Sequence, residues 1–436
     1  MTCPVCKSND IAEKIHHFEY FGKPYSISWC KTCDCWFYDP FPNTDYTDDL
    51  GGELSIRHYL ETTAGIEILA TISENFFTNF VGKGQRGLEI GCGFGFISHY
   101  LEKIHGQKMT AYEPSQYGVK GKELLGLNII KDYFRSDGEK IYDFAISTEV
   151  VEHIPDPVSF LADIRKSLTD DGKLLLSTPN KDSINMDAWQ AVDLALLSPG
   201  MHTVLFTEQS LKKALLLAGF TNVLIKKQGA TLYAIASMSH FKDAELFATD
   251  FAALMKYYQR IYSSAAPKSP LQKGLFYRLF RLYVDWGLYK EAAALLKDNP
   301  HFFILEKDEI LSIQTERDLM KYYSLTDSII YFYVGILYLN YLVNYEKAAL
   351  LFDLSFLSCK KRLAIVPHFG IVDSDIVWLA KLHQGIANDF LGKQLEAASC
   401  FIEILAARSS VANMPVPNES LRDDAKNRLK QLVATL

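Results

Sequence analysis

Residues 86–95 join a short apolar run to a glycine-rich turn, in the order Arg86-Gly87-Leu88-Glu89-Ile90-Gly91-Cys92-Gly93-Phe94-Gly95. We predict a strand over Arg86–Ile90 and a helix over Phe94–Ile104. Glycines between them let the backbone approach a ligand closely, at the N-terminus of a helix. A dinucleotide-binding turn would need Gly or Ala at position 96, which is Phe96, and Glu89 would repel a pyrophosphate. The stretch therefore favours a cationic ligand.

Short apolar runs and amphipathic stretches continue to alternate over residues 83–238. The predicted strands are Lys108–Tyr112, Asn128–Lys131, Tyr142–Ser147, Lys173–Ser177, Asn222–Lys226 and Thr231–Ala236. The predicted helices are Ser115–Leu125, Pro157–Leu168 and Thr207–Ala218. This alternation predicts an α/β domain with a mostly parallel sheet that helices cover on both faces. Ligands of such sheets bind at the carboxyl ends of the strands.

Five motifs in this region resemble those of the class I S-adenosylmethionine-dependent methyltransferases, in the same order. They are Leu88–Gly95, Tyr112–Ser115, Asp143–Asp156, Gly172–Asn180 and His202–Phe220. The resemblance implies a Rossmann-like, seven-stranded methyltransferase core and S-adenosylmethionine as the cofactor.

The resemblance also implies which residues hold that cofactor. Glu89 and the glycine turn would bind the methionine moiety, Glu113 the ribose hydroxyls, and Asp132 the adenine amino group. Cys92 lies inside the turn, and we interpret it as a small packing residue rather than a nucleophile. The complete cofactor set is Glu89, Gly91, Cys92, Gly93, Gly95, Glu113, Pro114, Asp132, Tyr133 and Thr148.

Two histidines are candidates for chemistry at the methyl acceptor. A sugar hydroxyl has a high pKa and benefits from a general base, and a histidine can serve near neutral pH. His153 follows the fourth motif strand, and His202 lies in the segment that would cover the acceptor. Glu149 would orient either histidine or face the cofactor. The alternative is structural: Glu152 and His153 brace their loop, and His202 packs within its own.

Five of the eight cysteines lie in the first 35 residues. Cys3, Cys6, Cys30 and Cys33 form two C-x₂-C pairs, the spacing of a structural zinc site. Cys35 is an alternative to Cys33 as the fourth ligand, and His16 and His17 are ligands only if the pairs fail. With its exit through Trp36–Pro42, the segment resembles the zinc-binding element of sugar C-methyltransferases. We therefore predict a small zinc ribbon over residues 1–42, followed by a helical linker over 43–82.

Strand signals nearly vanish after the core, and we predict an all-α domain over residues 240–436. Three stretches resemble tetratricopeptide hairpins: Phe276–Lys297, Tyr331–Phe352 and Leu379–Ile404. Their turn alanines are 56 and 49 residues apart rather than at the 34-residue period of a regular array. Two interpretations stay open, an accessory domain that packs on the core and a surface that binds a protein partner or a glycan.

Composition limits the classes of function. The net charge of −7 disfavours a protein that depends on the phosphate backbone of a nucleic acid or on an anionic membrane. We expect no signal peptide and no membrane span, and therefore a cytoplasmic protein. The leading hypothesis is methylation of a sugar, in a nucleotide sugar or a surface glycan precursor. The alternatives are an RNA methyltransferase and a cofactor-binding scaffold whose helical tail holds partners.

Overall fold

The chain divides into two compact units, each described here by itself. The computed structural model describes residues 1–20, 22–47, 52–62, 66, 75–77, 80–186, 191–242, 250–300, 306–322, 326–367, 370–408 and 414–435. The first unit comprises Met1–Ile56, Thr63–Ile184 and Leu196–Tyr257. The second comprises Arg57–Thr62, Asn185–Ala195 and Tyr258–Leu436. Among the described helices none is long and apolar enough to cross a membrane.

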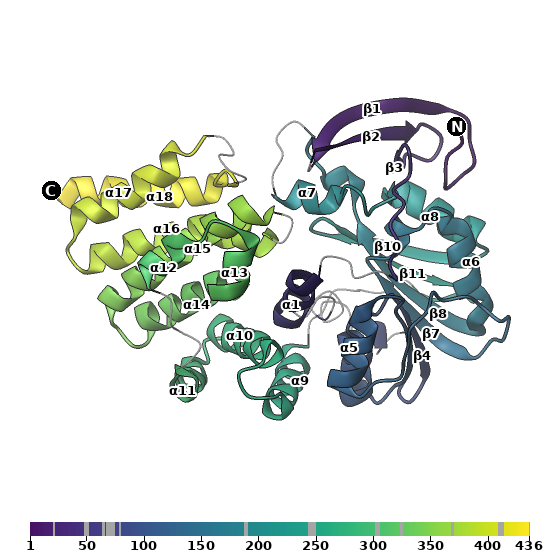
Figure 1. Cartoon of the computed structure of the whole chain (residues 1–436), viewed down its shortest axis with the longest axis horizontal. Helices are drawn as coiled ribbons and strands as arrows, with labels where there is room; N and C mark the ends of the chain where they lie inside the picture. Colours follow the sequence, from purple (N-terminus) through teal and green to yellow (C-terminus); the bar gives the residue numbers. More distant parts are fainter. Residues whose placement is uncertain are drawn as a thin grey trace. The chain divides into compact units, whose positions relative to one another are not determined.

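A seven-stranded sheet forms the centre of the first unit (Figure 1). Its order is β10-β11-β8-β7-β4-β5-β6. The β10–β11 and β11–β8 pairs are antiparallel, and the other four pairs are parallel. The strands are β4 (Arg86–Ile90), β5 (Lys108–Tyr112), β6 (Ile129–Ile130), β7 (Tyr142–Thr148), β8 (Leu168–Pro179), β10 (Asn222–Gln228) and β11 (Thr231–Ser237). This arrangement confirms the prediction of an α/β, Rossmann-like core.

The core helices begin and end where local sequence signals place them. They are α4 (Phe96–Tyr100), α5 (Gln116–Leu125), α6 (Pro157–Ser167) and α8 (Glu208–Leu217). Thr207 and Ser210 form a reciprocal capping box at the start of α8. The helix predicted to run to Ile104 differs, because after Tyr100 it loosens into a π-helical turn over Leu101–His105 that Gly106 ends.

The N-terminal segment forms a separate antiparallel sheet with a strand of the core. Its strands are β1 (Ile11–Tyr20), β2 (Lys23–Cys30) and β3 (Trp36–Tyr38). The fourth strand is β9 (Val204–Leu205), in which Val204 pairs with Phe37 and Leu205 with Trp36. The N-terminal segment is therefore hydrogen-bonded directly to the segment that contains His202.

The described part of the C-terminal region is helical. Its helices are α9 (Phe251–Ser264), α10 (Pro270–Asp285), α11 (Tyr289–Asp298), α12 (Lys307–Ser312), α13 (Glu316–Tyr322), α14 (Asp327–Asn340), α15 (Tyr345–Ile365), α16 (Ile371–Phe390), α17 (Gln394–Ala406) and α18 (Glu419–Thr435). Helix pairs α10–α11, α14–α15 and α16–α17 coincide with the three predicted hairpins. Likeness to tetratricopeptide repeats itself stays a prediction.

Two shorter helices belong to the remaining sequence. Helix α1 (Gly52–Thr62) lies in the predicted linker, whose apolar positions Leu69 and Ile72 fall outside the described residues. Helix α7 (Ala191–Leu197) precedes the segment that carries His202.

Candidate functional site

The glycine turn after β4 is held open by backbone geometry that only glycine adopts easily. Gly91, Gly93 and Gly95 all have positive φ, at 71°, 53° and 79°. Gly91 donates its N–H to the carbonyl of Tyr112 at 2.9 Å, and a Cβ on Gly91 would collide with the side chain of Val150. A Cβ on Gly93 would meet no atom within 4 Å. The turn is thus packed against the post-β7 segment on one side and open on the other.

Replacing Gly91 with alanine tests this packing. We expect Gly91→Ala to lower the free energy of unfolding by about 1–3 kcal/mol more than Gly229→Ala, measured by urea denaturation. Both glycines have positive φ, but a Cβ on Gly229 would meet nothing within 4 Å, so it controls for backbone strain alone. Equal losses in the two variants would contradict the close approach of Val150.

Glu89 lies almost fully buried at the end of β4, with 2% of its surface exposed. Its Oε2 accepts hydrogen bonds from the backbone N–H of Ser98, at 2.9 Å, and from the Ser98 hydroxyl. Burial raises the pKa of Glu89 to about 7, although the Ser98 bonds oppose the shift. The carboxylate therefore changes charge near neutral pH, and a cation beside it would favour the ionised form.

Glu113 joins the glycine turn to the end of β5. One carboxylate oxygen accepts from the N–H of Gly93 and the other from the N–H of Ser115, both at 2.9 Å. Each oxygen keeps a second lone pair for a further donor. Two hydroxyls of a ribose are such donors, so the geometry is compatible with the role that the resemblance implies.

The other predicted cofactor residues surround the same edge of the sheet. Cys92 is buried against Ala111, Leu127 and Ile129 as a packing residue, and burial raises the pKa of its thiol. Thr148 ends β7, and Pro114 follows Glu113. Asp132 and Tyr133 lie exposed just after β6, where Asp132 accepts from the N–H of Tyr133 at 2.7 Å. The role of these residues in binding the cofactor stays a prediction.

The segment after β7 brings Glu149, Glu152 and His153 together. Glu149 adopts φ 56°, a strained conformation for a residue other than glycine, and accepts from the Ser177 hydroxyl at 2.8 Å. Burial raises the pKa of Glu149 to about 7. Glu152 accepts from the Thr178 hydroxyl with Oε2, at 2.9 Å, whereas its buried Oε1 has no hydrogen-bond partner. A buried, unpartnered carboxylate oxygen is costly in a protein interior.

The two predicted histidines face that unpartnered oxygen. Nε2 of His153 lies 3.8 Å from Glu152 Oε1, and Nε2 of His202 lies 4.0 Å from it. Nδ1 of His202 lies 2.8 Å from the Leu196 carbonyl, and Nδ1 of His153 lies 3.1 Å from that of Met201. Because a carbonyl only accepts, Nδ1 of His202 carries the hydrogen and its Nε2 has a free lone pair. Nδ1 of His153 also lies 2.7 Å from the Tyr46 hydroxyl, which can either donate to it or accept from it.

Burial keeps both imidazoles neutral. It lowers the pKa of His153 to about 4 and the pKa of His202 well below its usual value. Burial also raises the pKa of Glu152, and the neighbouring Glu149 adds to the shift. One carboxylate oxygen and two imidazole nitrogens, all within 4.8 Å of one another, form a donor set that suits a divalent cation.

Residues of the N-terminal segment complete this cluster, and the sequence did not reveal them. The Tyr46 hydroxyl lies 2.7 Å from Nδ1 of His153 and donates to the Met201 carbonyl at 3.2 Å. Tyr38 donates its backbone N–H to Thr203 at 3.1 Å and its hydroxyl to Leu197 at 2.9 Å. These bonds fix the chain on both sides of His202.

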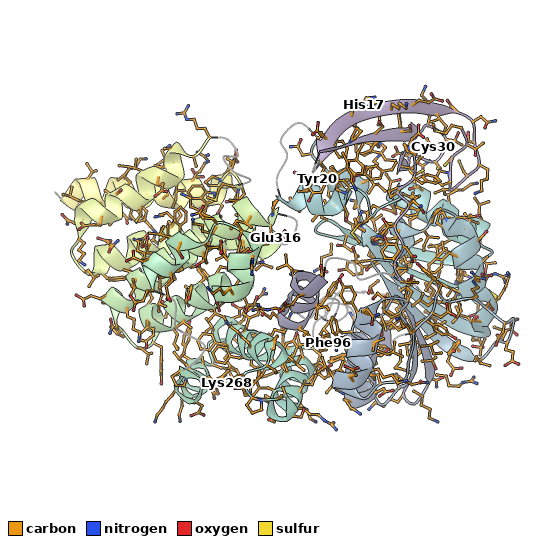
Figure 2. The ribbon with its side chains drawn as sticks, in the orientation of Figure 1. His17, Tyr20, Cys30, Phe96, Lys268 and Glu316 are labelled. Atoms are coloured by element: carbon orange, nitrogen blue, oxygen red, sulfur yellow. The ribbon has the colours of Figure 1, made fainter. Side chains whose placement is uncertain are left out.

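The four paired cysteines gather in the same N-terminal segment. The sulfur atoms of Cys3, Cys6, Cys30 and Cys33 all lie within 4.8 Å of one another, as a tetrahedral zinc site needs. The Cys6 N–H donates to Cys3 Sγ at 3.4 Å, a bond typical of a metal-binding turn. Among the described residues neither His16 nor His17 joins the cluster; His17 lies farther along β1 from Cys30 at the end of β2 (Figure 2). The thiolates fit zinc, which stays a prediction.

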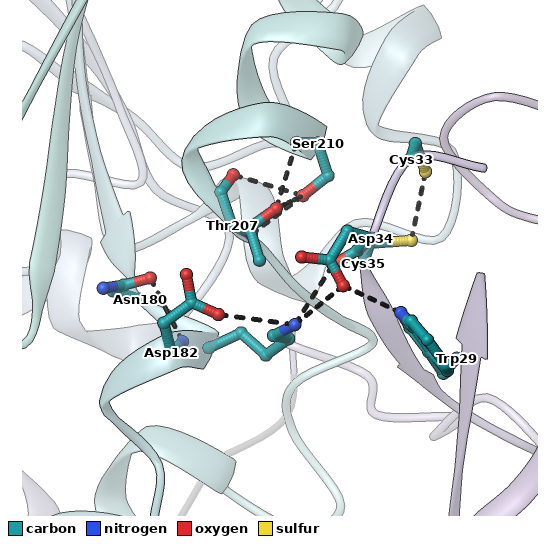
Figure 3. A network of polar contacts seen from close by, with 9 residues as sticks. Trp29, Cys33, Asp34, Cys35, Asn180, Asp182, Thr207 and Ser210 are labelled. Carbon is teal, nitrogen blue, oxygen red and sulfur yellow. Dashed lines mark hydrogen bonds and ion pairs between the residues drawn. The ribbon is translucent and has the colours of Figure 1, made fainter. Parts of the chain in front are cut away.

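A polar network connects the cysteine segment with the core (Figure 3). Lys181, directly after β8, contacts Asp34 at 2.9 Å, and Asp34 also accepts from Trp29 Nε1 at 2.8 Å. The ammonium group lies 5.2 Å from the centre of the Trp36 ring, within the range of a cation–π interaction. Contacts that fix the cysteine turn therefore also fix the end of β8.

The α/β core is similar in sequence to known proteins. Residues 57–225 match a family model described as a methyltransferase domain. This stretch is therefore similar to methyltransferase domains. The cysteine segment and most of the helical unit lie outside the matched residues.

Relatives of known name align with a smaller part of the chain. This chain is 33% identical over 112 residues to a ubiquinone biosynthesis O-methyltransferase of Actinobacillus pleuropneumoniae serotype 7 (strain AP76). The alignment covers 22% of this chain and 47% of that protein. This chain is 32% identical over 107 residues to the protein of that name in Xanthomonas oryzae pv. oryzae (strain PXO99A), covering 22% and 44%. The chain thus spans less than half the length of these relatives.

Solved structures are similar at lower identity. A SAM-dependent methyltransferase from Aquifex aeolicus is 18% identical with a TM-score of 0.31, covering 42% of this chain and 98% of that one. An S-adenosylmethionine-dependent methyltransferase from Mesorhizobium loti is 15% identical with a TM-score of 0.30, covering 35% and 91%.

Proposed function

We propose that the chain transfers a methyl group from S-adenosylmethionine to a hydroxyl oxygen of a sugar, in a nucleotide sugar or a surface glycan precursor. The observation that carries the proposal is the convergence of Glu152, His153 and His202. Glu152 and His153 closely follow Val150, which packs against Gly91 of the turn that would hold the donor. The acceptor would therefore lie between the methyl donor and these three side chains.

Hydroxyl oxygen is the acceptor that most needs such a cluster. An amine attacks a sulfonium once it is aligned, whereas a hydroxyl must also lose its proton. A histidine whose burial lowers its pKa to about 4 is a weak base for that proton. His153 is therefore a weaker candidate for the general base than the sequence analysis predicted.

A divalent cation would give the buried Oε1 of Glu152 a partner. We propose that Glu152 Oε1, His153 Nε2 and His202 Nε2 hold it. A cation bound there would lower the pKa of a hydroxyl that coordinates it. The surrounding residues orient the donors: Thr178 fixes the Glu152 carboxyl, the carbonyls of Leu196 and Met201 fix the two rings, and Ser177 fixes Glu149. In this arrangement Glu149 is a neighbour that tunes charge rather than a ligand.

Sugar acceptors are favoured by the N-terminal segment, residues 1–42, which resembles that of sugar C-methyltransferases and whose β3 pairs with β9 beside His202. Adjacent sugar hydroxyls can also occupy two positions on one cation. The relatives named ubiquinone biosynthesis O-methyltransferases favour a second candidate, a phenolic hydroxyl. Neighbouring phenolic hydroxyls chelate a cation in the same way, so acceptor specificity separates the two candidates.

An acceptor panel tests the proposal. The full chain would be incubated with methyl-labelled S-adenosylmethionine and GDP-mannose, UDP-glucose, catechol or RNA, with a deoxy-sugar nucleotide and phenol as matched controls. Label in an intact sugar but not its deoxy partner supports the proposal. Label only in catechol supports the second candidate, and label only in RNA contradicts both. Tight cofactor binding without any transfer would favour the scaffold alternative.

Cofactor binding should depend on pH through Glu89. Below pH 7 this carboxyl is mostly protonated, and binding a cationic amino group requires its ionised form. We therefore expect affinity for S-adenosylmethionine to rise by about tenfold between pH 6 and 8, with about half of the final value reached at pH 7, as measured by calorimetry. Glu89→Gln should bind more weakly and without this pH dependence, whereas the exposed Glu139→Gln should match the wild type. A flat wild-type profile would contradict the assignment of Glu89.

A further inference from the structure

A fifth cysteine adjoins the four-cysteine cluster. Sγ of Cys35 lies 3.5 Å from Sγ of Cys3 and 3.7 Å from that of Cys33, and the Cys35 thiol also interacts with Cys30. The Cys3–Cys33 distance is likewise 3.5 Å. Sulfur atoms of a tetrahedral zinc site are separated by about 3.8 Å, because each Zn–S bond is about 2.3 Å long. By these distances Cys35 is as close to the cluster as a ligand is.

Backbone geometry directs the Cys35 side chain into the cluster. Asp34 has φ 63°, which turns the chain after Cys33, and the Cys30 N–H donates to the Cys35 carbonyl at 3.0 Å. Cys35 has no exposed surface. Two other contacts fix Asp34 itself, those with Trp29 and Lys181, and the Cys33–Cys35 contact is drawn beside them in Figure 3.

Cys35 and Cys6 each interact with the thiols of Cys3, Cys30 and Cys33. The shortest sulfur contact of Cys35 is with Cys3, at 3.5 Å, and that of Cys6 is with Cys30, at 3.6 Å. Among the described sulfur atoms no hydrogen-bonding contact joins Cys6 to Cys35. Cys6 is also the one partly exposed member of the four. Three buried thiols are therefore shared by two candidates for the fourth position.

We propose that Cys35 is a reserve zinc ligand that takes the place of Cys6 when Cys6 is lost or modified. With Cys6 as ligand, Cys35 would stay outside the ligand set. When Cys6 no longer binds, Cys35 would bind as a thiolate, with its proton released to solvent, and would complete a second tetrathiolate set with Cys3, Cys30 and Cys33. The zinc segment thus keeps its fold after damage to its most accessible ligand.

Cobalt substitution in the full chain tests the ligand set independently of activity. Sulfur-to-cobalt charge-transfer absorbance grows with the number of bound thiolates. We expect Cys6→Ser to retain the four-thiolate intensity and Cys6→Ser/Cys35→Ser to fall to the three-thiolate intensity. Zinc affinity, measured against a competing chelator, should fall less than about tenfold in the first variant and by on the order of 100-fold or more in the second. Cys35→Ser alone should resemble the wild type.

Alkylation of the folded wild-type chain gives a second measurement, in case the variants fail to fold. Iodoacetamide forms a carbon–sulfur bond with the Cys6 thiolate and releases iodide, and mass spectrometry locates the adduct. We expect zinc to remain bound in the alkylated wild type and to be released from alkylated Cys35→Ser. Three-thiolate absorbance in Cys6→Ser, zinc release from both alkylated proteins, or a wild-type chain that binds neither zinc nor cobalt would overturn the proposal.

Discussion

Glu152→Gln should reduce kcat/KM for methyl transfer by at least about 100-fold while leaving the affinity for S-adenosylmethionine unchanged. Glutamine has the same shape and can keep the hydrogen bond from Thr178, but it removes the carboxylate that would bind a cation beside His153 and His202. Loss of a metal ligand should cost more than the roughly 10–100-fold typical of residues that only orient ligands. Steady-state kinetics with the acceptor found in the panel, together with calorimetry of cofactor binding, would measure both quantities.

Thr178→Val provides the matched control for this variant. It removes the hydrogen bond to Oε2 of Glu152 but preserves the charge at Oε1. We expect a smaller loss, on the order of 10-fold, because the carboxylate is less well oriented. Full activity in Glu152→Gln, or an equal loss of cofactor affinity, would contradict a role at the acceptor.

The second large loss of activity should come from changes in the cysteine segment, which is far from Glu152 in sequence. Cys3→Ser/Cys30→Ser should abolish zinc binding and lower kcat on the order of 100-fold, with cofactor affinity retained. A small segment of this kind gains much of its folding free energy from the metal. Without it, Tyr38 and Tyr46 would no longer hold the residues around His202 and His153, and small displacements of catalytic groups are costly. Metal analysis, kinetics and calorimetry on one preparation give the three quantities.

Tyr46→Phe separates positioning from folding in that argument. It should bind zinc like the wild type but lower kcat about tenfold, because only the hydroxyl at His153 Nδ1 is lost. Unchanged kcat in Cys3→Ser/Cys30→Ser would show that the zinc segment does not support the acceptor site.

The α/β core could be predicted from sequence because its signals are local. The glycine turn, the alternation of apolar runs and the Thr207 capping box each act within a few residues, and the predicted strands β4, β5 and β7 have the same first residue in the structure. The π-helical turn at Leu101–His105 was missed because its sequence retains helical periodicity.

The acceptor cluster was predicted only in part because it depends on long-range contacts. His153 and His202 were candidates, but sequence spacing could not show that both face Glu152 Oε1. Tyr46 lies 107 residues before His153, and the pairing of β3 with β9 brings residues near 37 and 204 together. Only the folded chain shows these contacts. A tyrosine shortly after the Pro-rich exit carried no signal of its own.

Chelation followed by selective metal replacement tests the central claim most directly. Methyl transfer would be measured before treatment with a chelator too weak to remove thiolate-bound zinc, after it, and after addition of Mn²⁺, which suits carboxylate ligands rather than thiolates. Metal analysis would verify that zinc stays bound. We predict that transfer is lost on chelation and restored by Mn²⁺ in the wild type but not in Glu152→Gln. Transfer that persists at full rate without any divalent cation would contradict the account.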